Sequence, residues 1–281
     1  MRILVYGDRG AAGDTALGWL MILAEHTSVQ ATLLMAYDRI ATGVTQLEGI
    51  VQFVRAQGGA VIVETADGAR ASSAIVSAAR RQPYDLIIVP PSMRGGAHGL
   101  LRSSRLSAVV RSVGSAVLVA HPPARPPQRI LVCVGGGTHS EVDAEVAARV
   151  AQPFKAQVVV LHIVSQVPLV YSGLEDMRSH LAQFMASGSP SARQIERAMS
   201  VLEDLGVNHD LLIREGIVVD EIIDEIRTGA YDLLVIGAHE RGGSLLQFFL
   251  EDLSDDLTHR SPIATLVVQG VEAWRGGRLS R

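Results

Sequence analysis

The sequence contains a single cysteine, Cys133, and few aromatic residues. One cysteine can form neither an intrachain disulfide nor a thiolate cluster for a metal ion. The sequence therefore excludes a disulfide-stabilised secreted scaffold and predicts a reducing, cytoplasmic location. Aromatic residues make up 4% of the chain, whereas hydrophobic residues as a whole make up 48%. This balance favours a core of valine, leucine, isoleucine and alanine, which is typical of parallel α/β sheets.

Strong net charge and long apolar runs are also absent. The formal net charge is −4 over 281 residues, which provides no general attraction for nucleic acid or anionic lipid. No apolar run reaches the ~18–20 residues that a membrane-spanning helix needs. Asp8 and Arg9 interrupt the first apolar run, so the N-terminus lacks the pattern of a secretion signal. We therefore expect neither nucleic acid nor a membrane as a partner.

Motifs of several enzyme classes are missing as well. The sequence has no G-x-S-x-G nucleophile motif, no Walker lysine motif and no H-E-x-x-H zinc motif. The glycines at 135–137 do not have the G-x-G-x-x-G spacing of a dinucleotide site. The acidic run at 251–256 suits the N-terminal turn of a helix better than a cation site. The sequence thus predicts no catalytic residues and no metal ligands.

What the sequence does contain is an internal repeat. "RILV" occurs at residues 2 and 129, "YDLIIVP" (84–90) matches "YDLLVIG" (231–237), and "AVLVA" (116–120) matches "ATLVV" (264–268). Three matches in the same order predict a duplication. The predicted parts are a first domain (1–122), a proline-rich linker (123–128), a second domain (129–270) with an insertion near 165–190, and a C-terminal tail (271–281).

Short aliphatic runs alternate with amphipathic stretches in both repeats. This alternation predicts right-handed βαβ units and two tandem, doubly wound α/β domains of the Rossmann-like kind, each with a five-stranded parallel sheet. Ligands of such sheets bind beyond the carboxyl ends of the strands. Strands are expected at 2–6, 31–37, 60–65, 85–90, 116–120, 129–134, 157–164, 208–214, 232–237 and 264–269, and helices near 13–26, 43–57, 70–81, 104–112, 140–151, 191–205, 218–228 and 250–259.

The two repeats resemble the universal stress protein family. The best-matching segments are "VLHIV" (160–164), "YDLLVIGAHERGG" (231–243) and "ATLVV", and the resemblance covers essentially the whole chain as two tandem copies. It implies a five-stranded parallel α/β fold and frequent dimerisation, with tandem members resembling a dimer fused into one chain. We therefore expect a homodimer or an intramolecular pseudo-dimer, with the strands at 116–120 and 264–269 as the seams.

The resemblance also implies an ATP site in the first domain. In the family, an aspartate after the first strand and a small residue after the second hold the adenine end, while G-x-x-G and G-[ST] hold the phosphates. Asp8, Ala36, Ser103 and Ser104 stand at the matching positions of this chain, as the implied cofactor-binding residues. However, the G-x-x-G segment is replaced by residues 90–93, whose two prolines remove two backbone donors. The nucleotide motifs are therefore degenerate.

The second copy departs further from the family pattern. Gly135 replaces the aspartate, Glu240 stands at the second glycine, and Glu251 and Asp252 stand at G-[ST]. A carboxylate ~4 Å from a phosphate oxygen costs about 4 kcal/mol at an effective dielectric near 20. We expect the second copy not to bind ATP in the family manner.

Three functions are compatible with this pattern. The first is a non-enzymatic regulatory or protective binding module in the stress response, which acts through an unidentified protein partner. The second is a universal stress protein that binds ATP and hydrolyses it slowly in the first copy. The third is a sensor of a small anion or metabolite, with the insertion near 165–190 as a lid over the second copy.

Overall fold

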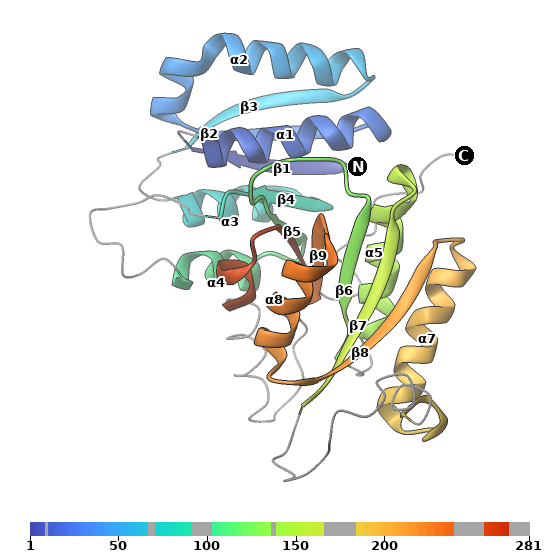
Figure 1. Ribbon diagram of the computed structural model, residues 1–281. Coiled ribbons are helices and arrows are strands. Elements are labelled where there is room, and N and C mark those ends of the chain that lie inside the picture. The colour runs from blue at the N-terminus through green and yellow to red at the C-terminus, as the bar shows by residue number, and fades with distance from the viewer. Residues whose placement is uncertain are drawn as a thin grey trace. The chain divides into compact units, whose positions relative to one another are not determined.

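The computed structural model describes residues 1–8, 11–66, 71–91, 103–135, 139–165, 184–238 and 256–269 (Figure 1). The chain divides into two compact units. Unit 1 comprises Met1–Pro126 together with Glu240–Arg281, and unit 2 comprises Pro127–His239.

The described strands of unit 1 form a sheet in which all but the last run parallel. The strands follow the order β3-β2-β1-β4-β5-β10, and only β10 runs antiparallel to its neighbour β5. Its elements are β1 (Arg2–Gly7), α1 (Ala11–His26), β2 (Gln30–Ala36), α2 (Tyr37–Ala56), β3 (Ala60–Ala66), α3 (Ala71–Arg81), β4 (Leu86–Val89), α4 (Ser103–Ser112), β5 (Ala116–Val119) and β10 (Ala264–Val268).

Among the described residues of unit 2, four parallel strands follow the order β9-β6-β7-β8. Its elements are β6 (Arg129–Cys133), α5 (Ser140–Ala151), the 3-10 turn η2 (Gln152–Phe154), β7 (Gln157–Ser165), α7 (Pro190–Asp204), β8 (His209–Gly216), α8 (Val218–Gly229) and β9 (Leu233–Gly237).

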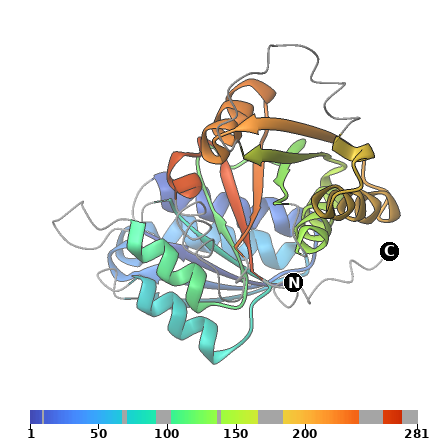
Figure 2. The same ribbon diagram turned by 90° about the horizontal axis from the view of Figure 1, so that it is seen from below.

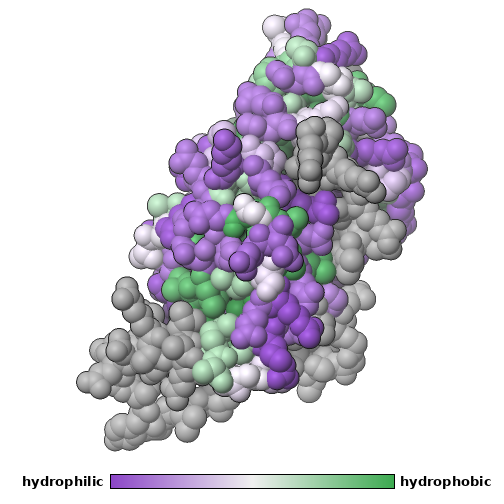
Figure 3. Space-filling view, turned by 90° about the vertical axis from the view of Figure 1, so that its right-hand side faces the viewer, coloured by the Kyte–Doolittle hydropathy of each residue, from purple (hydrophilic) through white to green (hydrophobic). Residues whose placement is uncertain are grey.

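Aliphatic side chains form the core of each unit. The central strands of unit 1 are buried along almost their whole length, as parallel strands covered on both faces must be. Helices α1 and α2 pack against each other, as do α3 and α4, and Figure 2 shows the two pairs on opposite sides of the strands. On the face of the chain drawn in Figure 3, hydrophilic residues cover most of the described surface.

The expected α/β fold is confirmed, and all ten expected strands are present within two residues of their expected limits. The clearest difference is α2, which begins at Tyr37 rather than near residue 43. Ala36 serves as its N-cap with an extended backbone and no side-chain hydrogen bond. The helix therefore starts directly at the end of β2, without the capping residue that marks a helix start in a sequence.

Strand β10 is the last strand of the second sequence repeat, yet it belongs to compact unit 1. It lies antiparallel to β5, with Leu266 opposite Leu118. The imidazole Nε2 of His121 lies 2.9 Å from the carbonyl oxygen of Thr258, and the side-chain amide of Gln269 donates to the carbonyl of Val110. The two strands expected as seams therefore pair with each other.

The contacts along this seam are related by the repeat. At the spacing that relates β5 to β10, His121 corresponds to Gln269 and Val110 corresponds to Thr258. Each of the two hydrogen bonds is thus the counterpart of the other, as a two-fold pairing of equivalent surfaces requires. The sequence-repeat limits of 1–122 and 129–270 remain a prediction.

Candidate functional site

The carboxyl ends of β1 and β2 lie side by side in unit 1. Gly7 of β1 stands opposite Met35 of β2, so the next residues of the two strands, Asp8 and Ala36, come to the same edge of the sheet. Both are buried, with 5% of Asp8 and 3% of Ala36 exposed. The two residues expected at the adenine end of a nucleotide are therefore neighbours at the edge where ligands of parallel sheets bind.

The first turn of α1 packs closely on the backbone of Asp8. A Cβ atom added at Gly13 would contact the carbonyl oxygen of Asp8 and lie 3.1 Å from its amide nitrogen. Glycine at this position thus permits the start of the helix to approach the end of β1. The position of Asp8 is defined by backbone packing, and its carboxylate belongs to the segment that leads into a helix N-terminus, where negative charge is favoured.

Met35 lies against Gly7 beneath this edge. A Cβ atom added at Gly7 would contact the terminal methyl of Met35 and lie 2.9 Å from its sulfur. The two residues pack together in the core directly beneath Asp8, so the surroundings of this carboxylate on that side are apolar.

The phosphate side of the expected site is described only in part. Ser103 and Ser104 form the start of α4, and because β4 and β5 are parallel, this helix begins at the same edge of the sheet as Asp8. The side chains of both serines and residues 92–102 lie outside the described part of the chain. Their contact with a phosphate group stays a prediction.

Unit 2 fills the equivalent edge differently. His162 of β7 stands at the position that Met35 holds in β2, and its Nδ1 lies 2.8 Å from the carbonyl oxygen of Val134. Because a carbonyl oxygen only accepts, Nδ1 carries the proton. Burial lowers the pKa of His162 below its ordinary value, although this hydrogen bond opposes the shift. Phe184, from the predicted insertion, packs on the imidazole with ring centres 5.5 Å apart.

Two of the other residues at the family's site positions in the second copy lie in the described part of the chain. Gly135, which replaces Asp8, is exposed beyond the end of β6, and Gly237 ends β9. Glu240, Glu251 and Asp252 lie outside the described residues. Unit 2 thus has no carboxylate at the Asp8 position and carries a buried imidazole on the adjoining strand.

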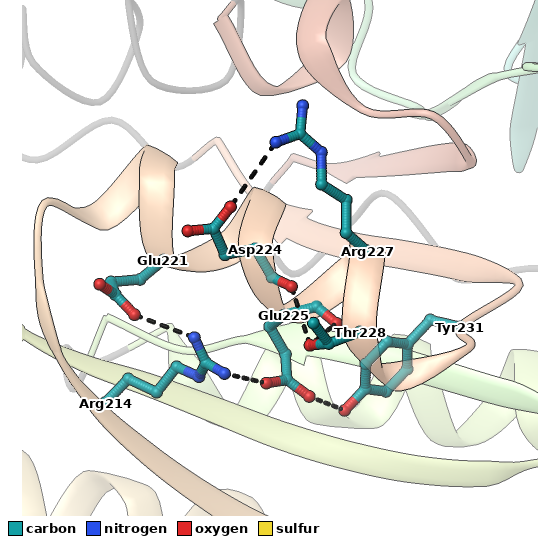
Figure 4. Close-up of polar contacts among 7 residues, drawn as sticks. All are labelled: Arg214, Glu221, Asp224, Glu225, Arg227, Thr228 and Tyr231. Carbon is teal, nitrogen blue, oxygen red and sulfur yellow. Dashed lines mark hydrogen bonds and ion pairs between the residues drawn. The ribbon is translucent and has the colours of Figure 1, made fainter.

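The sequence analysis did not predict a partly buried ion-pair cluster in unit 2. Arg214 of β8 lies between two carboxylates of α8, with Nη1 3.0 Å from Glu221 and Nη2 2.9 Å from Glu225. The hydroxyl of Tyr231 donates to the other oxygen of Glu225 at 2.7 Å (Figure 4). The guanidinium of Arg129 lies 4.6 Å from the centre of the Tyr231 ring. These contacts join α8 to the strands and have a structural role.

The repeated "YD" pair also has a structural explanation. A carboxylate oxygen of Asp85 accepts from the backbone amide of Arg2 at 2.7 Å. Asp232 accepts from the amide of Arg129 at 2.9 Å. Each aspartate thus binds the first residue of the opening strand of its repeat, so this match reflects sheet assembly rather than ligand binding.

The described part of the chain contains neither a metal-binding cluster nor a membrane-spanning helix. No group of three or more His, Cys, Asp or Glu side chains within it could hold a metal ion. None of the helices described there is both long and apolar enough to span a bilayer.

Comparisons with known proteins agree with the fold. A model of the universal stress protein family matches residues 127–269, just over half of the chain. Of the curated proteins compared, none matches. A protein of Pseudomonas aeruginosa UCBPP-PA14 assigned to the universal stress proteins is 19% identical, with a TM-score of 0.67 over 95% of this chain and 92% of that chain.

Two further solved structures are similar over different lengths. A universal stress protein of Archaeoglobus fulgidus DSM 4304 is 15% identical, with a TM-score of 0.64 over 95% of this chain and 96% of that one. A universal stress protein solved in complex with cAMP matches 52% of this chain and 98% of its own, at 16% identity and a TM-score of 0.38. The first of these shares the fold across both units.

Proposed function

Because the chain belongs to the universal stress protein family, we propose that it is a non-enzymatic regulatory or protective module of the stress response that binds ATP in unit 1 only. The observation that carries this proposal is that Asp8 and Ala36, both buried, directly follow the paired residues Gly7 and Met35 at the carboxyl edge of β1 and β2. It occurs in one of the two copies.

The chemistry of this edge fits the adenosine part of a nucleotide. Met35 packed against Gly7 makes the core beneath this edge apolar, and Asp8 provides an acceptor for the amino or hydroxyl hydrogens of an adenosine group. Ser103 and Ser104 open α4, whose N-terminal amides would attract phosphate oxygens. Pro90 and Pro91 lack amide hydrogens, so the phosphates would be held less firmly than by a glycine loop.

Unit 2 offers a contrasting environment. His162 stands at the position that Met35 holds in unit 1, and Phe184 packs on its imidazole. Gly135, at the position of Asp8, has no carboxylate. The packing of Phe184 on His162 supports a second candidate function for this unit. In it, the insertion covers a site for a small anion or metabolite rather than for ATP.

The pairing of β5 with β10 supports an intramolecular pseudo-dimer, because the seam expected between two copies is used within one chain. We expect the module to act in the cytoplasm through contacts with a protein partner. Slow ATP hydrolysis in unit 1 is the enzymatic alternative.

Equilibrium binding of labelled ATP tests the proposal. The intact protein should bind, while Asp8→Ala and Ser103→Glu should each weaken binding at least about tenfold, since loss of ~1.4 kcal/mol corresponds to tenfold in affinity. Gly135→Ala, at the matched position of unit 2, should leave the affinity unchanged. Affinity that survives both unit 1 substitutions would overturn the site. Absence of binding would overturn the nucleotide proposal, and phosphate release above a protein-free control would overturn the non-enzymatic one.

A further inference from the structure

The outer strands β3 and β8 are equivalent in the two repeats but differ in what they expose. Each is the third strand of its repeat and pairs with the second on its inner side. Two rows of paired residues establish the equivalence: Leu4–Thr32–Ile62 in unit 1 and Leu131–Val159–Asp210 in unit 2. An isoleucine in the first copy therefore stands where the second copy has an aspartate.

Strand β3 is an unprotected apolar edge. Ile62 is 60% exposed and Val63 is 43% exposed, and among the described residues β3 pairs only with β2. Natural sheets protect open edges with charged residues, and β8 follows that rule. Asp210 on its edge accepts a hydrogen bond from Gln157 at 2.6 Å, and Arg214 is held by ion pairs to α8. The first copy lacks this protection at the same place.

The backbone of β3 can accept another strand. The amide of Ala60 donates to the carbonyl of Val29 at 2.9 Å and so faces β2. Residues of a parallel ladder alternate in the direction of their hydrogen-bonding groups. Val61, Val63 and Thr65 therefore direct their amides and carbonyls outward, away from β2.

We propose that β3 pairs antiparallel with β3 of a second copy of this chain, about a two-fold axis at Ile62. In this register Ile62 faces its own counterpart as a closely spaced pair without mutual hydrogen bonds. Val61 and Val63 exchange both backbone hydrogen bonds with Val63 and Val61 of the second copy. The three aliphatic residues thus become mutually buried, and the outward groups of Val61 and Val63 gain partners.

The charged side chain of β3 does not oppose this arrangement. Glu64 is the charged residue of β3, and it already forms an ion pair with Arg81. In the proposed register Glu64 lies opposite Ala60 of the second copy, so the two Glu64 side chains do not face each other across the seam. The other outer strand of the first repeat, β5, is already paired with β10.

The mass of the full chain in solution provides the first test. Light scattering over a range of concentrations should show a species of twice the 30.0 kDa of one chain. Ile62→Asp, which gives β3 the residue of β8, should shift the dissociation constant upward at least about tenfold. The control Ile217→Asp replaces a side chain that is 72% exposed outside β3 and should leave the dimer intact. A monomer at every concentration, or a dimer insensitive to Ile62→Asp, would overturn the proposal.

Cross-linking tests the register. The Cα atoms of a closely spaced antiparallel pair are about 4.5 Å apart, within the ~4.4–6.8 Å that a disulfide spans. Ile62→Cys should therefore form a disulfide-linked dimer on mild oxidation. In the same register Thr65 lies opposite Gly59 of the second copy, so two Thr65→Cys thiols would be about 20 Å apart and should not cross-link. Equal cross-linking at both positions, or none at Ile62→Cys, would overturn the register. ATP binding is measured separately, so the two proposals can fail independently.

Discussion

Replacing Glu225 should cost far more stability than replacing Glu221, although both carboxylates bind Arg214. Glu225 uses one oxygen for Arg214 at 2.9 Å and the other for the hydroxyl of Tyr231 at 2.7 Å. Its side chain is 10% exposed, whereas that of Glu221, 3.0 Å from the guanidinium, is 27% exposed. The two residues provide an internal comparison of a buried and a more solvated partner of the same arginine.

The expected losses follow from this difference. Glu225→Ala removes the acceptor of a buried tyrosine hydroxyl, which costs about 1–3 kcal/mol. It also removes one partner of the ion pair with Arg214. In a fully buried ion pair, such a loss costs about 3–5 kcal/mol. Arg214 is 26% exposed and keeps Glu221, so we expect a total near 3 kcal/mol. Glu221→Ala should cost about 0–1 kcal/mol, as exposed pairs do.

Urea unfolding followed by far-ultraviolet circular dichroism measures both losses. The variants should shift the midpoint of the transition without changing its slope. Tyr231→Phe should lose about 0.5–1.5 kcal/mol or somewhat more, since its acceptor is charged. Burial and Glu225 both raise the pKa of Tyr231, so Glu225→Ala should lower that pKa in a titration of tyrosinate absorbance. Equal losses for Glu221→Ala and Glu225→Ala would refute the reasoning.

Two further predictions concern the stability of the chain. Gly13→Ala places a methyl against the carbonyl of Asp8 and should lower the free energy of unfolding by about 1–3 kcal/mol. Gly49→Ala, in open space on α2, should raise it by about 0.5–1 kcal/mol. Chemical denaturation of both variants checks these values, and an unchanged stability of Gly13→Ala would contradict the first. His162 has a folded pKa below its unfolded value, so the unfolded chain binds more protons as the pH falls below about 6.5, and stability decreases there. His162→Gln should flatten that decrease between about pH 7 and 5, and an unchanged pH dependence would show that His162 does not contribute.

The strands could be predicted from the sequence because each is a short, almost continuous apolar run, as in β1 and β4. Their pairing followed from the alternation with helices. The start of α2 could not be predicted, since Ala36 provides no side-chain cap. The pairing of β10 with β5 agrees with the seams that the family resemblance implied. The grouping of β10 with the first compact unit was not predicted, because it depends on this tertiary contact rather than on the sequence of either repeat.

The proximity of Asp8 and Ala36 was predictable, because residues that follow neighbouring parallel strands meet at one edge. The contact of Phe184 with His162 was not, because the two residues are separated by a long segment without a regular pattern. Arg214 and Glu225 carry the pattern of solvated charges on an edge strand and an amphipathic helix. Only the packing of α8 on β8 brings them together as a partly buried pair.

The central claim is that one chain binds one nucleotide, in unit 1. Isothermal titration of the intact protein with ATP measures the stoichiometry directly. We predict one ATP per chain and its loss in Asp8→Asn, which removes the charge of a buried carboxylate while keeping its shape. Two ATP molecules per chain, or one that remains bound in Asp8→Asn, would contradict the account.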